Sequence, residues 1–75
     1  MNEWERMMRK AKMYKELYPK GTRVELIQMG DDPRPIAPGT KGTVDFVDSI
    51  GTIHCMFDDG RYLGLIPGED QFRKI

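Results

Sequence analysis

The stretch "FDDGRYLGLIPGEDQFRKI" (Phe57–Ile75) decides the fold, because it holds two turns at the close spacing of a small antiparallel β-protein. Asp59-Gly60 separates two alternating segments, and this dipeptide favours a two-residue hairpin turn with positive φ at both positions. Residues 61–66 are then a strand, residues 67–71 a turn, and residues 72–75 a short last strand. The end of the chain thus predicts a hairpin followed by a closing strand.

The segments before this stretch share its period of two. Residues 22–29, 41–48 and 52–57 alternate as strands, whereas residues 30–40 contain three prolines and form a long ordered loop. Gly64 in the fourth strand fits a bend. The side chains expected to point inward are Val24 and Leu26 in the first strand, Val44 and Phe46 in the second, and Ile53, Cys55 and Phe57 in the third.

The first twenty residues have the helical period instead. Asn2 is a suitable N-cap with Glu5 three positions later, and Pro19 and Gly21 end the helix. One face carries an apolar stripe of Trp4, Met7, Met8, Ala11, Tyr14 and Tyr18. We therefore predict a mainly β protein, in which an amphipathic α-helix (residues 1–20) precedes a small five-stranded SH3-like barrel (residues 21–75).

Composition indicates the number of domains and the cellular location to expect. The chain has 75 residues and a single cysteine, so we expect one domain without an internal disulfide, which is typical of a reducing, cytoplasmic location. No apolar run is long enough to span a membrane, and the N-terminus lacks the apolar stretch of a signal peptide. Formal charge is zero overall, with residues 1–20 basic and residues 21–75 acidic.

Several segments resemble one known family. Pro38-Gly39-Thr40, Gly42-Thr43-Val44, Ile53-His54, Asp59-Gly60 and "LIPGEDQF" (Leu65–Phe72) are similar to the family of domain of unknown function 4314, found in Firmicutes, their phages and mobile elements. The resemblance implies an SH3-like fold and a mobile-element setting in a bacterial host cell. The family brings no settled activity with it. Cys55 and Phe57 stand where the family more often has Val and Trp.

No catalytic group or metal site is predicted. His54 and Cys55 are adjacent, and adjacent strand residues point to opposite faces, so their side chains cannot act as a nucleophile and its base. The acids at turns, which are Asp31, Asp32, Asp58, Asp59, Glu69 and Asp70, match no metal-binding loop and suit local backbone amides. We expect a protein that is not an enzyme and holds no cofactor.

The candidate ligand-binding residues are Arg34, Lys41, His54, Asp59, Arg61, Tyr62 and Arg73. We expect recognition at the Pro-rich loop (residues 32–38) and the hairpin turn (residues 59–62), because loops on a rigid barrel usually carry it. A basic and aromatic face for nucleic acid, adding Arg23, Lys74 and Phe72, is disfavoured by the acidic balance of residues 21–75.

Two functional hypotheses follow. The first is a small accessory protein of a phage or mobile element that recognises a protein or nucleic-acid partner. The alternative is an oligomeric anti-defence protein that sequesters a nucleotide second messenger, with Arg34, Lys41 or Arg61 on phosphates and Tyr18 or Tyr62 on a base. The helix stripe either covers the barrel near Ile27 and Met29 or pairs with another copy of the chain or with a partner protein. Its candidate interface residues are Trp4, Met8, Ala11, Tyr14 and Tyr18.

Overall fold

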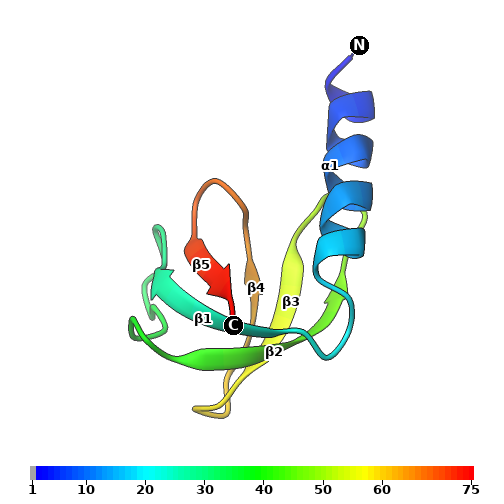
Figure 1. The fold of residues 1–75 in the computed structure, drawn as a ribbon. Coiled ribbons are helices and arrows are strands. Elements are labelled where there is room, and N and C mark those ends of the chain that lie inside the picture. Colours follow the sequence, from blue (N-terminus) through cyan, green and yellow to red (C-terminus); the bar gives the residue numbers. More distant parts are fainter. Residues whose placement is uncertain (1) are drawn as a thin grey trace.

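The computed structural model describes residues 2–75, so Met1 of the predicted helical segment lies outside the described residues. Helix α1 (Glu3–Leu17) precedes strands β1 (Arg23–Gln28), β2 (Lys41–Val47), β3 (Ile53–Phe57), β4 (Tyr62–Leu65) and β5 (Gln71–Lys74) (Figure 1). The five strands form one antiparallel sheet in the order β4-β3-β2-β1-β5. The prediction of a mainly β fold with an N-terminal helix is confirmed.

The sheet is strongly bent around its core, and its edge strands β4 and β5 share no ladder within residues 2–75, so the barrel is open. The bend gathers inward side chains of β1 to β4, together with Ile36 of the long loop, into one cluster, and Phe72 of β5 packs against it. The buried residues of the cluster are Val24, Leu26, Ile36, Val44, Val47, Ile53, Cys55, Phe57 and Leu65. Within residues 2–75, no helix is long and apolar enough to cross a membrane.

The long loop between β1 and β2 contributes to this core. Ile36 is 1% exposed and belongs to the buried cluster, although the prolines around it exclude a strand. The loop returns to β1 through two backbone hydrogen bonds, since Gly39 N donates to Leu26 O at 2.7 Å and Leu26 N donates to Thr40 O at 2.9 Å. It is therefore an ordered part of the barrel wall.

A β-bulge in β2 overturns the prediction for Phe46. Val44 pairs with Cys55, but the next pair is Phe46 with His54, so Asp45 is an extra residue without a partner in β3. The alternation therefore shifts by one position after Val44. Phe46 points outward and Val47 points inward, with exposures of 48% and 7%. The predicted inward positions in β1 and β3 are confirmed.

The hairpin between β3 and β4 forms at the predicted place with a different turn. Its loop has three residues, Asp58–Gly60, since Phe57 N donates to Arg61 O at 2.8 Å and Gly60 N donates to Phe57 O at 2.9 Å. Gly60 has a φ of 91°, and no non-glycine residue described by the structure has positive φ. The expectation of positive φ at Asp59 is therefore wrong, because the loop is one residue longer than predicted.

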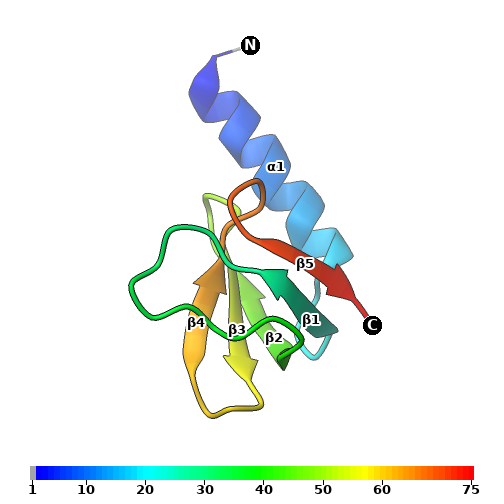
Figure 2. The same ribbon diagram turned by 90° about the vertical axis from the view of Figure 1, so that its left-hand side faces the viewer.

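Helix α1 begins as predicted, with the Asn2 side chain accepting a hydrogen bond of 2.8 Å from Glu5 N. Only its C-terminal half rests on the barrel, and its first turns project beyond the sheet (Figures 1 and 2). Ala11 is buried with its Cα near Gly51, and the Tyr18 ring lies 5.7 Å from that of Phe72. The idea that the whole stripe covers the barrel is wrong, because Trp4, Met8 and Ile27 are exposed.

Candidate functional site

Three stacked rings lie on the outer face of β2, β3 and β4. Phe46 and His54 have ring centroids 4.4 Å apart and planes within 6° of parallel. The Tyr62 ring follows on the other side of His54, with centroids 6.3 Å apart. We call Phe46, His54 and Tyr62 the aromatic row. Two of its members, Phe46 and Tyr62, are large apolar side chains exposed on the surface.

The middle ring is held by Asp48, in the turn after β2. Asp48 Oδ2 lies 2.8 Å from His54 Nε2, and Asp48 Oδ1 accepts hydrogen bonds of 3.0 Å from the backbone N–H groups of Ile50 and Thr52. Burial by itself raises the pKa of Asp48, but the hydrogen bonds from His54 and the two amides outweigh it and lower the pKa below 3.8. The row is thus anchored to a carboxylate that stays charged at neutral pH.

The outer ring is fixed by the bulge residue. Tyr62 Oη donates a hydrogen bond of 2.7 Å to Asp45 Oδ2, which raises the pKa of Tyr62 to about 12. Lys20 Nζ lies 3.7 Å from the other oxygen of Asp45. Beside this pair is a hollow of about 360 Å³ whose walls include Thr43, Val44 and Met56. The hollow therefore adjoins the aromatic row, because Tyr62 and the Asp45 carboxylate that holds it also line the hollow.

The acids around the row are paired. Asp45 and Asp58 have the cationic neighbours Lys20 and Arg23, and Asp48 contacts the His54 ring. Arg23 makes a two-pronged contact with Asp58 at 2.7 and 2.8 Å, and its guanidinium lowers the pKa of that carboxyl. This pairing disfavours a phosphate backbone as the ligand, because such binding depends on free positive charge.

Three other predicted site residues meet at the corner between the hairpin and the Pro-rich loop. Arg61 Nη2 donates to Arg34 O at 2.5 Å, Arg61 Nη1 donates to Pro35 O at 3.4 Å, and Asp59 Oδ1 accepts from Arg61 N at 3.0 Å. The two loops are adjacent, as expected for a shared surface. The Arg61 guanidinium already binds carbonyl groups of the chain, so its contacts here are structural.

Arg73 lies away from both places, and Lys41 adjoins the hairpin loop. Arg73 Nε and Nη2 contact Glu25 Oε1 at 2.7 Å across the β1–β5 pair. Lys41 begins β2, where its carbonyl accepts a hydrogen bond of 2.8 Å from Asp58 N. The structure therefore distributes the predicted ligand residues over three regions and brings only His54 and Tyr62 into the aromatic row.

Comparison with known proteins gives the family. The model of the family "Domain of unknown function (DUF4314)" matches residues 7–75. The chain belongs to this family. A search of curated proteins found no match.

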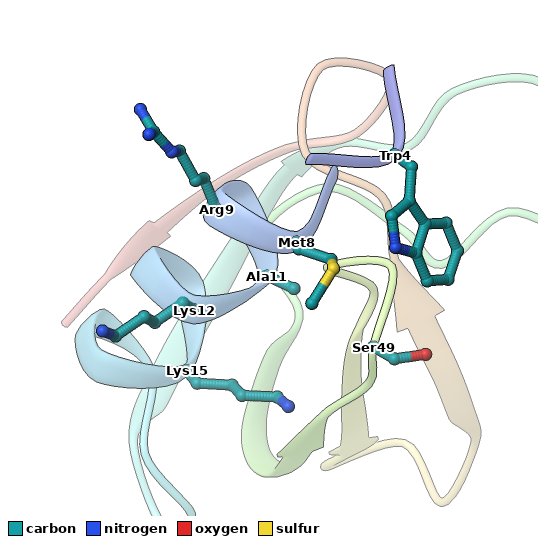
Figure 3. A pocket seen from close by; sticks show the side chains of 7 residues that line it. All are labelled: Trp4, Met8, Arg9, Ala11, Lys12, Lys15 and Ser49. Atoms are coloured by element: carbon teal, nitrogen blue, oxygen red, sulfur yellow. The ribbon is translucent and has the colours of Figure 1, made fainter. Parts of the chain in front are cut away.

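In this DUF4314 protein the match begins at Met7, inside helix α1, so Trp4 and the first helical turn precede it. The predicted interface residues divide at about this point. Tyr14 and Tyr18 are partly buried against the core, and Ala11 is buried. Trp4 and Met8 instead border an open groove of about 430 Å³ (Figure 3). We call the groove lined by Trp4, Met8, Arg9, Ala11, Lys12, Lys15 and Ser49 the helix groove.

His54 and Cys55 of the DUF4314 protein face opposite sides of the sheet, as predicted. His54 joins the aromatic row, whereas Cys55 is 0% exposed within the core. Burial raises the pKa of the Cys55 thiol to about 11, so the thiol is not an activated nucleophile. Within residues 2–75, no three side chains of His, Cys, Asp or Glu gather where they could hold a metal ion.

Sequence reasoning missed four residues of the aromatic row, its anchors and the adjoining hollow, which are Phe46, Asp45, Asp48 and Met56. Strict alternation from Val44 predicts that Phe46 points into the core, and the bulge that turns it outward depends on pairing with β3. Asp48 carries a local signal, since an Asp that starts a turn often accepts hydrogen bonds from amides two residues later. That signal predicts the turn, and only the pairing of β3 brings His54 to the same carboxylate.

Proposed function

We propose that this protein is a non-catalytic binding protein, and that its aromatic row recognises an extended, proline-containing segment of a partner protein. The observation that supports this most directly is the exposed stack of Phe46 on His54. His54 is covered by its neighbours in the stack, so the open apolar surface of the row belongs to Phe46 and Tyr62 at its two ends, and a proline ring can pack against these aromatic side chains. The hollow beside Tyr62 is suited to an apolar side chain of the same segment.

Preorganisation of the row supports a binding role. His54 and Tyr62 are each fixed by a carboxylate, at 2.8 and 2.7 Å, so their rings are held in place before a ligand arrives. A ligand that stacks on a fixed ring loses little additional side-chain entropy from the protein. A proline-rich segment likewise is extended before binding, so the ordering cost is small on both sides.

A protein segment suits this surface better than a nucleic acid does. Ring stacking is available to either, but nucleic acid also requires cations along the backbone path. Lys20 and Arg23, next to the row, are already paired with Asp45 and Asp58. An accessory role in a phage or mobile element, in the cytoplasm of a bacterial host, is part of this proposal and comes from the family resemblance.

The proposal is tested by NMR titration of the labelled full chain with a panel of proline-rich peptides, single-stranded oligonucleotides and nucleotides. We expect peptide-induced shifts at the backbone amides of Phe46, His54 and Tyr62. The variant Phe46→Ala removes half of the stack and should weaken binding about tenfold or more. The matched control is Ile27→Ala, which removes an exposed apolar side chain from β1, outside the row.

Other outcomes count against the proposal. Binding that Phe46→Ala leaves unchanged would place the ligand elsewhere. Oligonucleotide binding at the row would replace the peptide with nucleic acid. A nucleotide that shifts Arg34, Lys41 and Tyr62 together would favour the sequestration hypothesis. The absence of shifts with every proline-rich peptide would reject the row as a proline-binding surface.

A further inference from the structure

We infer that the helix groove binds the first helical turn of a second copy of this chain, so that two α1 helices pack antiparallel in a two-fold dimer. This surface lies on the helix, apart from the aromatic row on the sheet, so the inference is independent of the proposed function. It begins from the exposure of Trp4, the single tryptophan of the chain, whose side chain is 64% exposed.

The position of the groove explains why the chain cannot fill it. Trp4 and Met8 point to the side of α1 on which Ser49 lies (Figure 3). Met8 is about one turn and Trp4 about two turns further from the barrel than Ala11. The turn of residues 48–51 meets the helix at Ala11 and Tyr14, where a Cβ added to Gly51 would lie 3.7 Å from Ala11 Cα. The apolar stripe of the helix therefore continues past the end of the surface that covers it.

The groove has room for an aromatic side chain. Its volume is about 430 Å³, and its lining includes Met8 and Ala11, a flexible side chain and a small one. Exposed methionines adapt to the shape of an incoming ring. A tryptophan side chain buries about 150–250 Å² in such a site. In a two-fold dimer Trp4 of each copy enters the groove of the other, and both exposed rings are covered at once.

Charge complementarity identifies the second copy as the occupant. The first turn is acidic, with Glu3 and Glu5, while the following turns carry Arg9, Lys10 and Lys12. In an antiparallel two-fold pair, each flank of one helix lies against the same flank of the other helix, and the two flanks run in opposite directions. At 100° per residue Glu5 shares a flank with Arg9 and Lys12, and Glu3 shares the other flank with Lys10.

The register that seats Trp4 between Met8 and Ala11 of the second copy also pairs these charges. Glu5 of each copy then lies opposite Arg9 of the other, and Glu3 lies opposite Lys10. A parallel arrangement sets acid against acid and base against base. The ion pairs that the structure shows within residues 2–75 all lie elsewhere, from Lys20 onward. The charges of α1 that this dimer uses are thus not taken by those pairs.

The first test measures the mass of the full chain by light scattering and the emission of Trp4 as protein concentration rises. We expect a mass approaching twice 8.7 kDa, together with a shift of the emission to shorter wavelength as the ring leaves water. Trp4→Ala should give a monomer that keeps its helix by circular dichroism. A wild-type monomer at every concentration, or a dimer that survives Trp4→Ala, would overturn the inference.

A charge swap separates this dimer from other ways of associating. The variants Glu3→Lys/Glu5→Lys and Arg9→Glu/Lys10→Glu should each be monomeric, and an equal mixture of the two should recover the dimer. The control Asp31→Lys/Glu69→Lys makes the same charge change as the first variant in exposed loops and should dimerise by itself. If the mixture stays monomeric while both variants keep their helices, the antiparallel pairing is wrong.

Discussion

Phe46 and His54 stack face to face on the outside of the sheet, with ring centroids 4.4 Å apart and planes within 6° of parallel. They meet because one extra residue, Asp45, shifts the alternation of β2 relative to β3. The same bulge residue then accepts the hydroxyl hydrogen bond of Tyr62 at 2.7 Å. The one-residue bulge at Asp45 therefore both exposes the Phe46 ring and holds the Tyr62 ring in place.

Gly64 is expected to tolerate no side chain. A Cβ at this position would lie 2.6 Å from Thr52 Cγ2, so Gly64→Ala should lower the free energy of unfolding by about 1–3 kcal/mol. Thr52→Ser removes the clashing methyl group, and the double variant should regain most of that loss. Urea denaturation of the four chains measures the coupling. Additive effects of the two substitutions would show that the methyl group is not what excludes a side chain.

Ile36 should be the most important residue of the Pro-rich loop for stability. It is 1% exposed within the core, so Ile36→Ala should lower the free energy of unfolding by about 2–5 kcal/mol. The matched control is Ile50→Ala, at an isoleucine that is 56% exposed, which should change it by less than about 0.5 kcal/mol. The free energy of unfolding of both variants is measured by thermal and urea denaturation. If Ile36→Ala and Ile50→Ala lower it by the same amount, Ile36 is not part of the core.

Asp48 should make stability depend on pH in the acid range. Its pKa is lower in the folded chain than the ordinary 3.8, so its stabilisation is present above that value and is lost as pH falls through the folded pKa. Asp48→Asn should cost on the order of 1 kcal/mol at neutral pH. The variant should also lose less stability than the wild type as pH falls below about 4.

Asp58→Asn is the comparison for this pH experiment. The pKa of Asp58 is also lowered, by its hydrogen bond to Arg23, but Asp58 is exposed. Solvent screens such a pair, so this variant should change the acid limb of the stability curve less than Asp48→Asn does. A larger change at Asp58 would mean that the Asp48–His54 contact contributes little.

Cys55 should be unreactive in the folded protein. The thiol is fully buried and its pKa is raised to about 11, so little thiolate is present near neutral pH. Alkylation with iodoacetamide, followed by mass spectrometry, should be slow in buffer and fast in denaturant. The reagent can reach Cys55 only when the core opens. Rapid labelling of the native chain would therefore show that β3 separates readily from its neighbours.

The sequence by itself determined the elements and most of the core. Alternation of period two located the strands, and the cap at Asn2 located the start of α1, because these signals act between residues a few positions apart. Val24, Leu26 and Ile53 are buried as alternation predicts. Their faces follow from local geometry and from the exclusion of apolar side chains from water.

Only the tertiary structure decided where the candidate site lies. Phe46 points outward because of its pairing with β3, Ile36 enters the core because the loop folds back on β1, and α1 docks along half of its length because the turn at Gly51 reaches no further than Ala11. Each outcome depends on contacts between residues distant in the chain. A local pattern carries no information about such contacts, so strand register and helix docking had to be read from the folded structure.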